Sequence, residues 1–136
     1  MKKPLTFLGL IVFMLALVSP TAAQSPTITF VNPPQNGLLE LNVGESYTFE
    51  VQVTSDPAFN KAQLGLSQYY PGRSVFADGI VSARGGTSAT LKLSITGKTP
   101  TDKLPGGVAP MTLVVGVRYQ GGEVVSQSFE FNVRVK

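Results

Sequence analysis

Apolar and polar side chains alternate along most of this chain. The clearest stretch runs from Tyr47 to Thr54, where Tyr47, Phe49, Val51 and Val53 share one row and polar side chains occupy the other. An alternation with a period of two residues predicts a half-buried β-strand. Such a strand needs a second layer of structure to cover its apolar row.

Similar stretches recur along the chain, and Gly, Pro, Asn and Asp turn signals separate them. The expected strands are residues 27–31, 38–41, 47–54, 59–67, 74–77, 80–83, 88–96, 111–119 and 124–136. The first two are interpreted as halves of one edge strand, because Pro33 and Pro34 interrupt them. The pattern predicts an all-β fold, a two-sheet antiparallel sandwich of about seven to eight strands. An up-and-down barrel is the alternative.

The turn signals also predict how the strands connect. Residues 88–96 repeat the pattern of residues 47–54, so we expect these two strands to pair. Asp78-Gly79 indicates a hairpin between 74–77 and 80–83, and Gly121-Gly122 indicates a two-residue hairpin between the last two strands. Residues 97–110, rich in Gly and Pro, are expected to cross from one sheet to the other.

The N-terminal segment has the layout of a secretory signal peptide. Two lysines precede an apolar run from Leu5 to Val18, and small residues at Thr21 and Ala23 suit a cleavage site. The run is shorter than the roughly 20 apolar residues that a membrane-spanning helix needs. We therefore expect a signal peptide at residues 1–23, cleaved after Ala23, and one domain at residues 24–136. An uncleaved N-terminal anchor is the alternative.

Composition narrows the range of partners. Without Lys2 and Lys3 the mature chain keeps nine basic and eight acidic residues and has no basic run, so neither nucleic acid nor an anionic membrane is an expected partner. The chain has no Cys, and therefore neither disulfides nor the lipid-anchoring cysteine of a bacterial lipoprotein. We expect an exported protein in the extracellular space, on the cell surface or in the periplasm, with no membrane span in its mature chain.

Three stretches carry a family resemblance: residues 39–49, residues 89–95, and residues 111–119 with the loop before them and the hairpin after them. Together they resemble the immunoglobulin-like, fibronectin-type β-sandwich domains of secreted and envelope proteins of bacteria and archaea. The antibody-type Cys pair and core Trp are absent, and Met111 stands where a Tyr often opens the penultimate strand. The resemblance implies adhesion, spacing or ligand presentation.

The sequence offers little catalytic chemistry. It contains no His and no Cys, which removes Ser-His and Cys-His nucleophiles and most zinc sites. Glu50 and Glu130 fall on outward strand faces, and Asp56, Asp78 and Asp102 occupy turns. No two carboxylates have a spacing that predicts a shared cleft, and no stretch of the sequence resembles a calcium-binding loop. We expect neither an enzyme nor a bound metal or cofactor.

One surface stretch, residues 69–73, has the composition of a binding site. Tyr and Arg are enriched at binding hot spots, so Tyr69, Tyr70 and Arg73 are the candidate ligand-binding residues. The competing interpretation is that either Tyr closes the end of the sandwich. We expect a non-enzymatic domain that acts through protein-protein contacts in adhesion, structure or assembly. The alternative is a small carbohydrate-binding module that uses these three residues.

The proline-interrupted lead at residues 24–37 also bears on assembly. It could cover its own sandwich or pair with the edge of a neighbouring copy.

Overall fold

The computed structural model describes residues 25–68 and 74–136. The expected signal peptide and the candidate residues Tyr69, Tyr70 and Arg73 lie outside this part of the chain. In chain order the elements are β1 (Thr27–Phe30), the 3₁₀ turn η2 (Gln35–Gly37), β2 (Leu38–Leu41), β3 (Ser46–Gln68), β4 (Val75–Ala77), β5 (Val81–Gly97), the 3₁₀ turn η3 (Pro105–Gly107), β6 (Ala109–Arg118) and β7 (Val124–Val135).

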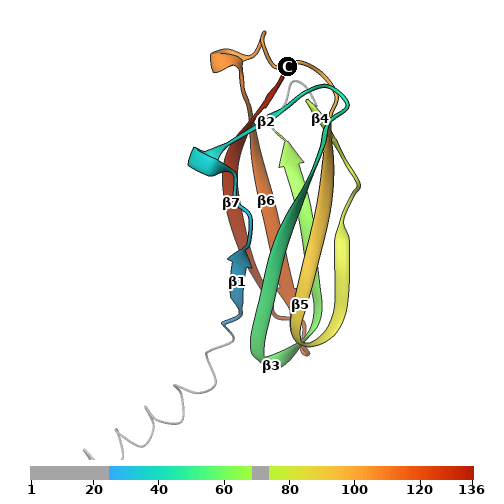
Figure 1. Cartoon of the computed structure of the whole chain (residues 1–136). Coiled ribbons are helices and arrows are strands. Elements are labelled where there is room, and N and C mark those ends of the chain that lie inside the picture. The colour runs from blue at the N-terminus through green and yellow to red at the C-terminus, as the bar shows by residue number, and fades with distance from the viewer. Residues whose placement is uncertain (1–24, 69–73) are drawn as a thin grey trace, which may run out of the picture.

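Two long strands, β3 and β5, run side by side and belong to both layers of the sandwich (Figure 1). In the first sheet, residues 46–54 of β3 pair with residues 88–96 of β5, β1 pairs with β3, and β4 pairs with the end of β5. In the second sheet, residues 61–68 of β3 pair with β6, β6 pairs with β7, and β7 pairs with β2. Backbone hydrogen bonds therefore connect all seven strands through β3 and β5.

Both long strands change sheet at a local irregularity. The pairing of β3 with β5 shifts register between Thr54 and Phe59, where Pro57 has no N–H to donate. On the facing stretch of β5, Gly85 and Gly86 have φ values of 45° and 130°, which favour glycine. The expected strands 47–54 and 59–67 are thus two halves of one bent strand, and residues 80–83 and 88–96 are likewise parts of β5.

The main expectations for the fold are confirmed: the chain forms a two-sheet β-sandwich, and residues 47–54 pair with residues 88–96 as predicted. Residues 98–108 cross from β5 in the first sheet to β6 in the second, as expected. β6 lies between β3 and β7, so it is the central strand of its sheet.

Three connections differ from the sequence prediction. Residues 75–77 do not pair with residues 80–83; they pair with residues 95–97, while Val81 pairs with Leu64 of β3. Gly79 has φ 99°, which favours glycine, but the chain does not reverse at residues 78–80. β4 and the start of β5 run in the same direction, and the chain passes here from the first sheet to the second (Figure 1). The loop between β6 and β7 holds three residues, because the Tyr119 N–H donates to the Glu123 carbonyl.

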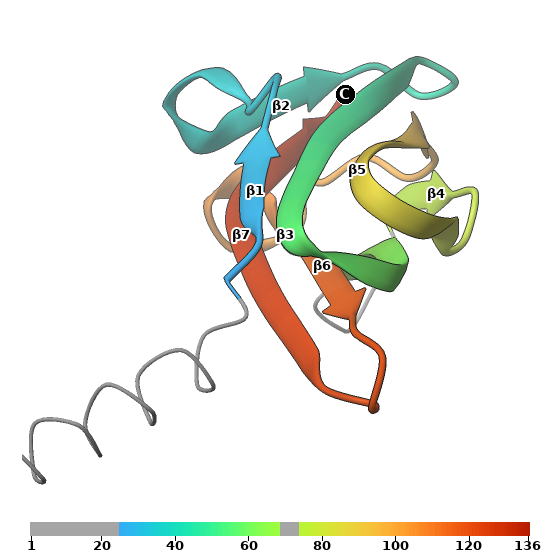
Figure 2. The ribbon, with the colours of Figure 1, turned by 90° about the horizontal axis from the view of Figure 1, so that it is seen from below.

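The third difference concerns the split first strand. β1 joins the first sheet antiparallel to β3, whereas β2 joins the second sheet parallel to β7. The chain keeps its direction as it passes from one sheet to the other, so its second half meets β7 in the parallel sense. Seen along the strands, β1 lies between β3 and β7 (Figure 2). The lead therefore covers its own sandwich.

The core is built from the apolar rows of both sheets. Phe49, Val51 and Val53 of β3 are fully buried against the matching rows of β5, β6 and β7. Phe30 of β1 packs edge-on against Phe49 and Phe129, with ring centroids 5.7 and 5.3 Å apart, and so joins the two sheets.

Candidate binding site at the β4 end

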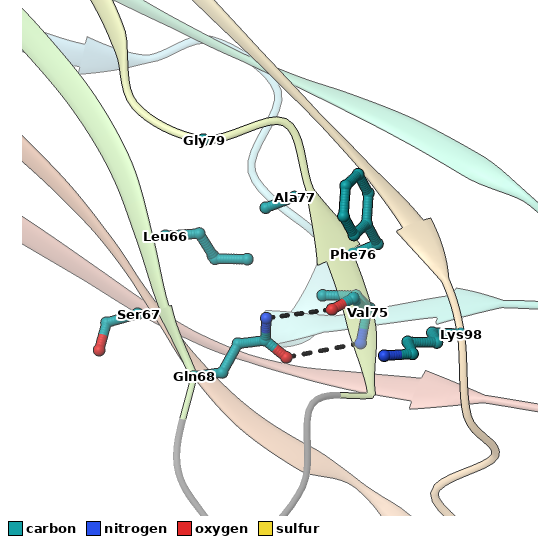
Figure 3. Close-up of a pocket in the computed structure, with 8 residues that line it drawn as sticks. All are labelled: Leu66, Ser67, Gln68, Val75, Phe76, Ala77, Gly79 and Lys98. Carbon is teal, nitrogen blue, oxygen red and sulfur yellow. Dashed lines mark hydrogen bonds between the residues drawn. The ribbon is translucent and has the colours of Figure 1, made fainter.

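A hollow of about 530 Å³ lies between the last residues of β3 and strand β4 (Figure 3). The edges of β3 and β4 that face the hollow are not paired with another described strand. The pairing of β3 with β5 ends at Leu64, so residues 65–68 have β6 on one side and the hollow on the other. Its lining residues are Leu66, Ser67, Gln68, Val75, Phe76, Ala77, Gly79 and Lys98.

Gln68 bridges the hollow at one end. Its side-chain Nε2 donates to the Val75 carbonyl at 3.1 Å, and the Val75 N–H donates to its Oε1 at 3.4 Å (Figure 3). The side-chain amide thus satisfies both backbone groups of Val75, as a paired strand would. This contact fixes the distance between β3 and β4.

The β4 strand is anchored on its other side as well. The carbonyl of Ser74, a buried residue, accepts hydrogen bonds from the N–H groups of Lys98 and Thr99, at 2.8 and 3.1 Å. The Val75 side chain is fully buried, which holds the strand against the core. Hydrogen bonds and a buried side chain therefore hold β4 in place beside the hollow.

The rim of the hollow is apolar and exposed. The Phe76 side chain is 63% exposed, and Ile80, in the connection that closes the other end, is 71% exposed. Lys98 contributes a cation, and among the described residues no carboxylate lies within ion-pair distance of it. Large exposed apolar side chains beside polar groups are typical of contact surfaces.

The candidate residues Tyr69, Tyr70 and Arg73 lie outside the described part of the chain, and their relation to this hollow is known from the sequence. Tyr69 follows Gln68 directly, and Arg73 precedes Ser74. The sequence analysis assigned no role to Gln68, Phe76 or Lys98. Phe76 lies in a short stretch of alternating residues, and its exposure depends on which face of that stretch is covered. The sequence pattern therefore did not predict that its side chain is exposed.

No group of three or more His, Cys, Asp or Glu in residues 25–68 and 74–136 could hold a metal ion. Lys136 and Arg134 hold the pKa of the Glu40 carboxyl below its usual 4.5, through hydrogen bonds and charge attraction. The lowered pKa favours the ionised form of the Glu40 carboxyl, which lies in an exposed ion cluster, whereas a general acid must be protonated. None of the described helices is long and apolar enough to cross a membrane.

Comparison with known proteins gives structural neighbours alone. No protein-family profile and no curated protein sequence matches the chain. A chain of the complex between Zinc 2-glycoprotein and Prolactin inducible protein from human seminal plasma superposes with a TM-score of 0.53 at 12% identity, over 85% of this chain and 98% of that chain. The major pilin subunit of Bacillus cereus gives a TM-score of 0.50 at 11% identity, over 82% of this chain and 41% of that chain.

Domains 4 and 5 of the S-layer protein SbsC give a TM-score of 0.49 at 12% identity, over 83% of this chain and 53% of that chain. The chain thus spans about half the length of that two-domain structure. At these identities the likeness concerns the fold alone. The observed topology, together with the two neighbours at TM-scores of 0.53 and 0.50, shows that the chain has the immunoglobulin-like β-sandwich fold.

Proposed function

We propose that the chain is a non-enzymatic immunoglobulin-like domain of an exported or cell-surface protein, and that it acts through protein-protein contacts. One observation carries this proposal: Phe76 lines the hollow and stands exposed on the firmly anchored strand β4, and Ile80, in the connection after β4, is exposed as well. A rigid support with exposed apolar side chains buries area on binding at little entropic cost. We propose in addition that the contacts serve adhesion, structure or assembly. We also propose that the chain comes from the fibronectin-type domains of bacteria or archaea.

We further propose that Tyr69, Tyr70 and Arg73 extend this contact surface. In the sequence they stand between Gln68 and Ser74, two described residues that lie at the β4 end. Tyr and Arg supply large contact area together with hydrogen bonds.

Capture of partners tests the proposal. The tagged protein is cross-linked in its native host, and the proteins that co-purify are identified by mass spectrometry. The double variant Phe76→Ser with Ile80→Ser is expected to lose specific partners. The matched control, Val31→Ser with Val43→Ser, removes two side chains that are 45% and 53% exposed elsewhere and should retain them. Equal capture by all three proteins would contradict the assignment of this surface.

Export is tested separately. The intact mass of the exported protein should equal that of a chain starting at Gln24, because the signal peptide is cleaved after Ala23. A full-length mass would favour the N-terminal anchor instead.

The second candidate function is carbohydrate binding, and the size and lining of the hollow favour it. A space of about 530 Å³ suits a small ligand, and Gln68 and Lys98 supply amide and ammonium groups, whereas the Ser67 hydroxyl points away from the hollow (Figure 3). A glycan array with the exported protein tests it, using Tyr70→Ala with Arg73→Ala as the binding variant. Sugar binding that this variant loses, with an unchanged unfolding midpoint, supports the module. Signals absent for both proteins contradict it.

A further inference from the structure

The edges of the two sheets differ in how well they are protected against pairing with another chain. An exposed strand edge offers unpaired N–H and C=O groups, and natural proteins hinder it by shortness, Pro, charge or bends. β1 has four residues and leads to Pro33-Pro34, and β4 has three residues, with Gln68 bonded to Val75. β2 has four residues and carries the Glu40–Arg134 ion pair at 2.8 Å.

The outer edge of β5 is also hindered. It bends at Gly85 and Gly86 and carries Arg84 and Lys92. An incoming strand would have to follow the bend and accommodate both cations.

The first two thirds of β7 show none of these devices, and the neighbouring element there is β1, whose Phe30 packs against Phe129. β2 pairs with residues 132–135 of β7, so residues 124–131 have a partner only on the β6 side among the described residues. The pairing with β6 keeps one register from Val124 to Val133, so the edge is regular. At about 3.4 Å per residue it is roughly 27 Å long. Residues 124–129 carry no charge and no Pro.

We infer that this edge pairs with the same edge of a second copy of the chain, antiparallel and about a two-fold axis at Gln127. The inference rests on the proposed function as a contact domain, and it concerns a surface separate from the β4 end. A two-fold axis makes the contact self-complementary, because each residue meets its counterpart reciprocally.

This register matches the side chains. It sets Val125 opposite Phe129 of the second copy, and Val125 and Phe129 are only half-buried within their own chain. Aromatic and β-branched residues form favourable cross-strand pairs. Ser126 faces Ser128 of the second copy, and Glu130 faces Val124. No like charges are opposed.

The contact is small, at the low end of interface sizes, so we expect a reversible dimer whose fraction rises with protein concentration. Its main-chain bonds would extend the second sheet from one copy into the other.

Cysteine cross-linking tests the register directly, because the chain has no native Cys. In the inferred dimer the two Gln127 residues form a non-hydrogen-bonded pair with Cα atoms about 4.5 Å apart, within disulfide range. With oxidised glutathione as oxidant, the exported Gln127→Cys protein should form a disulfide-linked dimer several-fold faster than Thr90→Cys, whose thiol is exposed on the first sheet. Equal rates would overturn the inference.

A charge variant tests the edge without a cross-link. Ser126→Lys with Ser128→Lys sets like charges opposite each other across the axis and should raise the dimer dissociation constant by about tenfold or more. Light scattering over a range of concentrations measures it. Gln52→Lys with Thr90→Lys, a directly paired site on the first sheet, is the matched control and should leave dimerisation unchanged. A monomeric native protein at all concentrations, or equal effects of both variants, would refute the edge contact.

The outcomes separate this inference from the proposed function. If Phe76→Ser with Ile80→Ser keeps its partners yet Gln127→Cys cross-links, the β4 site is wrong and the β7 dimer stands. If the partners are lost and no cross-link forms, the β4 site stands and the dimer is wrong.

Discussion

Gly97 shows how a single residue without a side chain fixes the junction of three segments. An ideal Cβ at this position would lie 2.5 Å from the Asn42 carbonyl oxygen and 3.3 Å from a methyl carbon of Val135. The Gly97 N–H donates to the Glu45 carbonyl at 2.9 Å, and its own carbonyl accepts from the Gly44 N–H at 2.8 Å. The backbones at Gly97 and Asn42 approach closely because Gly97 has only a hydrogen atom where other residues have a Cβ.

Gly97→Ala should therefore destabilise the fold. The added methyl group must push the Asn42 turn away, and we expect the free energy of unfolding to fall by about 2–3 kcal/mol. Urea unfolding of the two proteins measures the change. Gly116→Ala is the control, because the nearest atom to its added Cβ is the Ser126 hydroxyl at 4.0 Å. A Gly97 effect no larger than that of Gly116 would contradict the steric argument.

Buried polar groups make a second point at this scale. The Ser55 hydroxyl donates to the Pro57 carbonyl at 2.8 Å and lies 2.6 Å from the Tyr119 hydroxyl, which therefore donates to it. Thr101 is fully buried, and its hydroxyl donates to the Gly107 carbonyl at 2.7 Å and accepts from the Val135 N–H at 3.1 Å. No sequence pattern marked these residues, because their partners are 64 and 34 residues distant or lie in irregular loops.

At the scale of elements, the short strand β2 depends on both backbone pairing and charge. It has four residues, and Glu40 on its exposed face contacts Arg134 at 2.8 Å and Lys136 at 3.3 Å. These cations lower the pKa of Glu40 in the folded state, so its contribution to stability is fully present above pH 4.5 and is lost as the pH falls through the lowered value.

Glu40→Gln should thus be less stable than the natural protein at pH 7, and the difference should shrink as the pH falls below 4.5. Because Glu40 is exposed, the effect is small and salt should screen it. Urea unfolding at several pH values and two salt concentrations measures it. Glu130→Gln, an exposed site on β7 with no cation within 4 Å among the described residues, is the control for the loss of one carboxylate. A pH-independent difference would contradict the charge argument.

The pairing of β4 shows why local signals mislead at this scale. Asp78-Gly79 predicted a hairpin, yet the chain does not reverse there and the residues on its two sides join different sheets. An Asp-Gly pair permits a reversal without requiring one, and the partner of a three-residue strand depends on which edge is free nearby.

At the scale of the whole molecule, the sharing of β3 and β5 makes the two sheets one mechanical unit. Each sheet includes half of both strands, so neither can open without breaking pairs that belong to a continuous strand. This arrangement predicts a single cooperative unfolding transition.

Native-state hydrogen exchange tests this cooperativity. Amide protons in residues 46–54 and in β6 should exchange with the same free energy, equal to that of global unfolding. The amide protons of β4, a three-residue edge strand, should exchange faster through local opening and serve as the internal control. A lower exchange free energy for one entire sheet would show that the sheets unfold separately.

The sequence by itself determined which residues are strands and which rows face the core. This information is local, since an alternating row such as Tyr47 to Val53 can be buried on one face only. The turn at Gly121-Gly122 was equally readable, because positive φ favours glycine. For the candidate site, the sequence pointed to residues 69–73 but to none of the residues that line the adjoining hollow.

Only the tertiary structure decided how these strands are joined. It bent β3 and β5 through both sheets, sent β1 and β2 to opposite sheets, and left one side of residues 65–68 and of residues 124–131 without a partner in the described chain. Edges and hollows arise where strands of unequal length are assembled, so no single strand encodes them. Pairing is a property of two segments distant in the chain, and it depends on all the other pairs that compete with it.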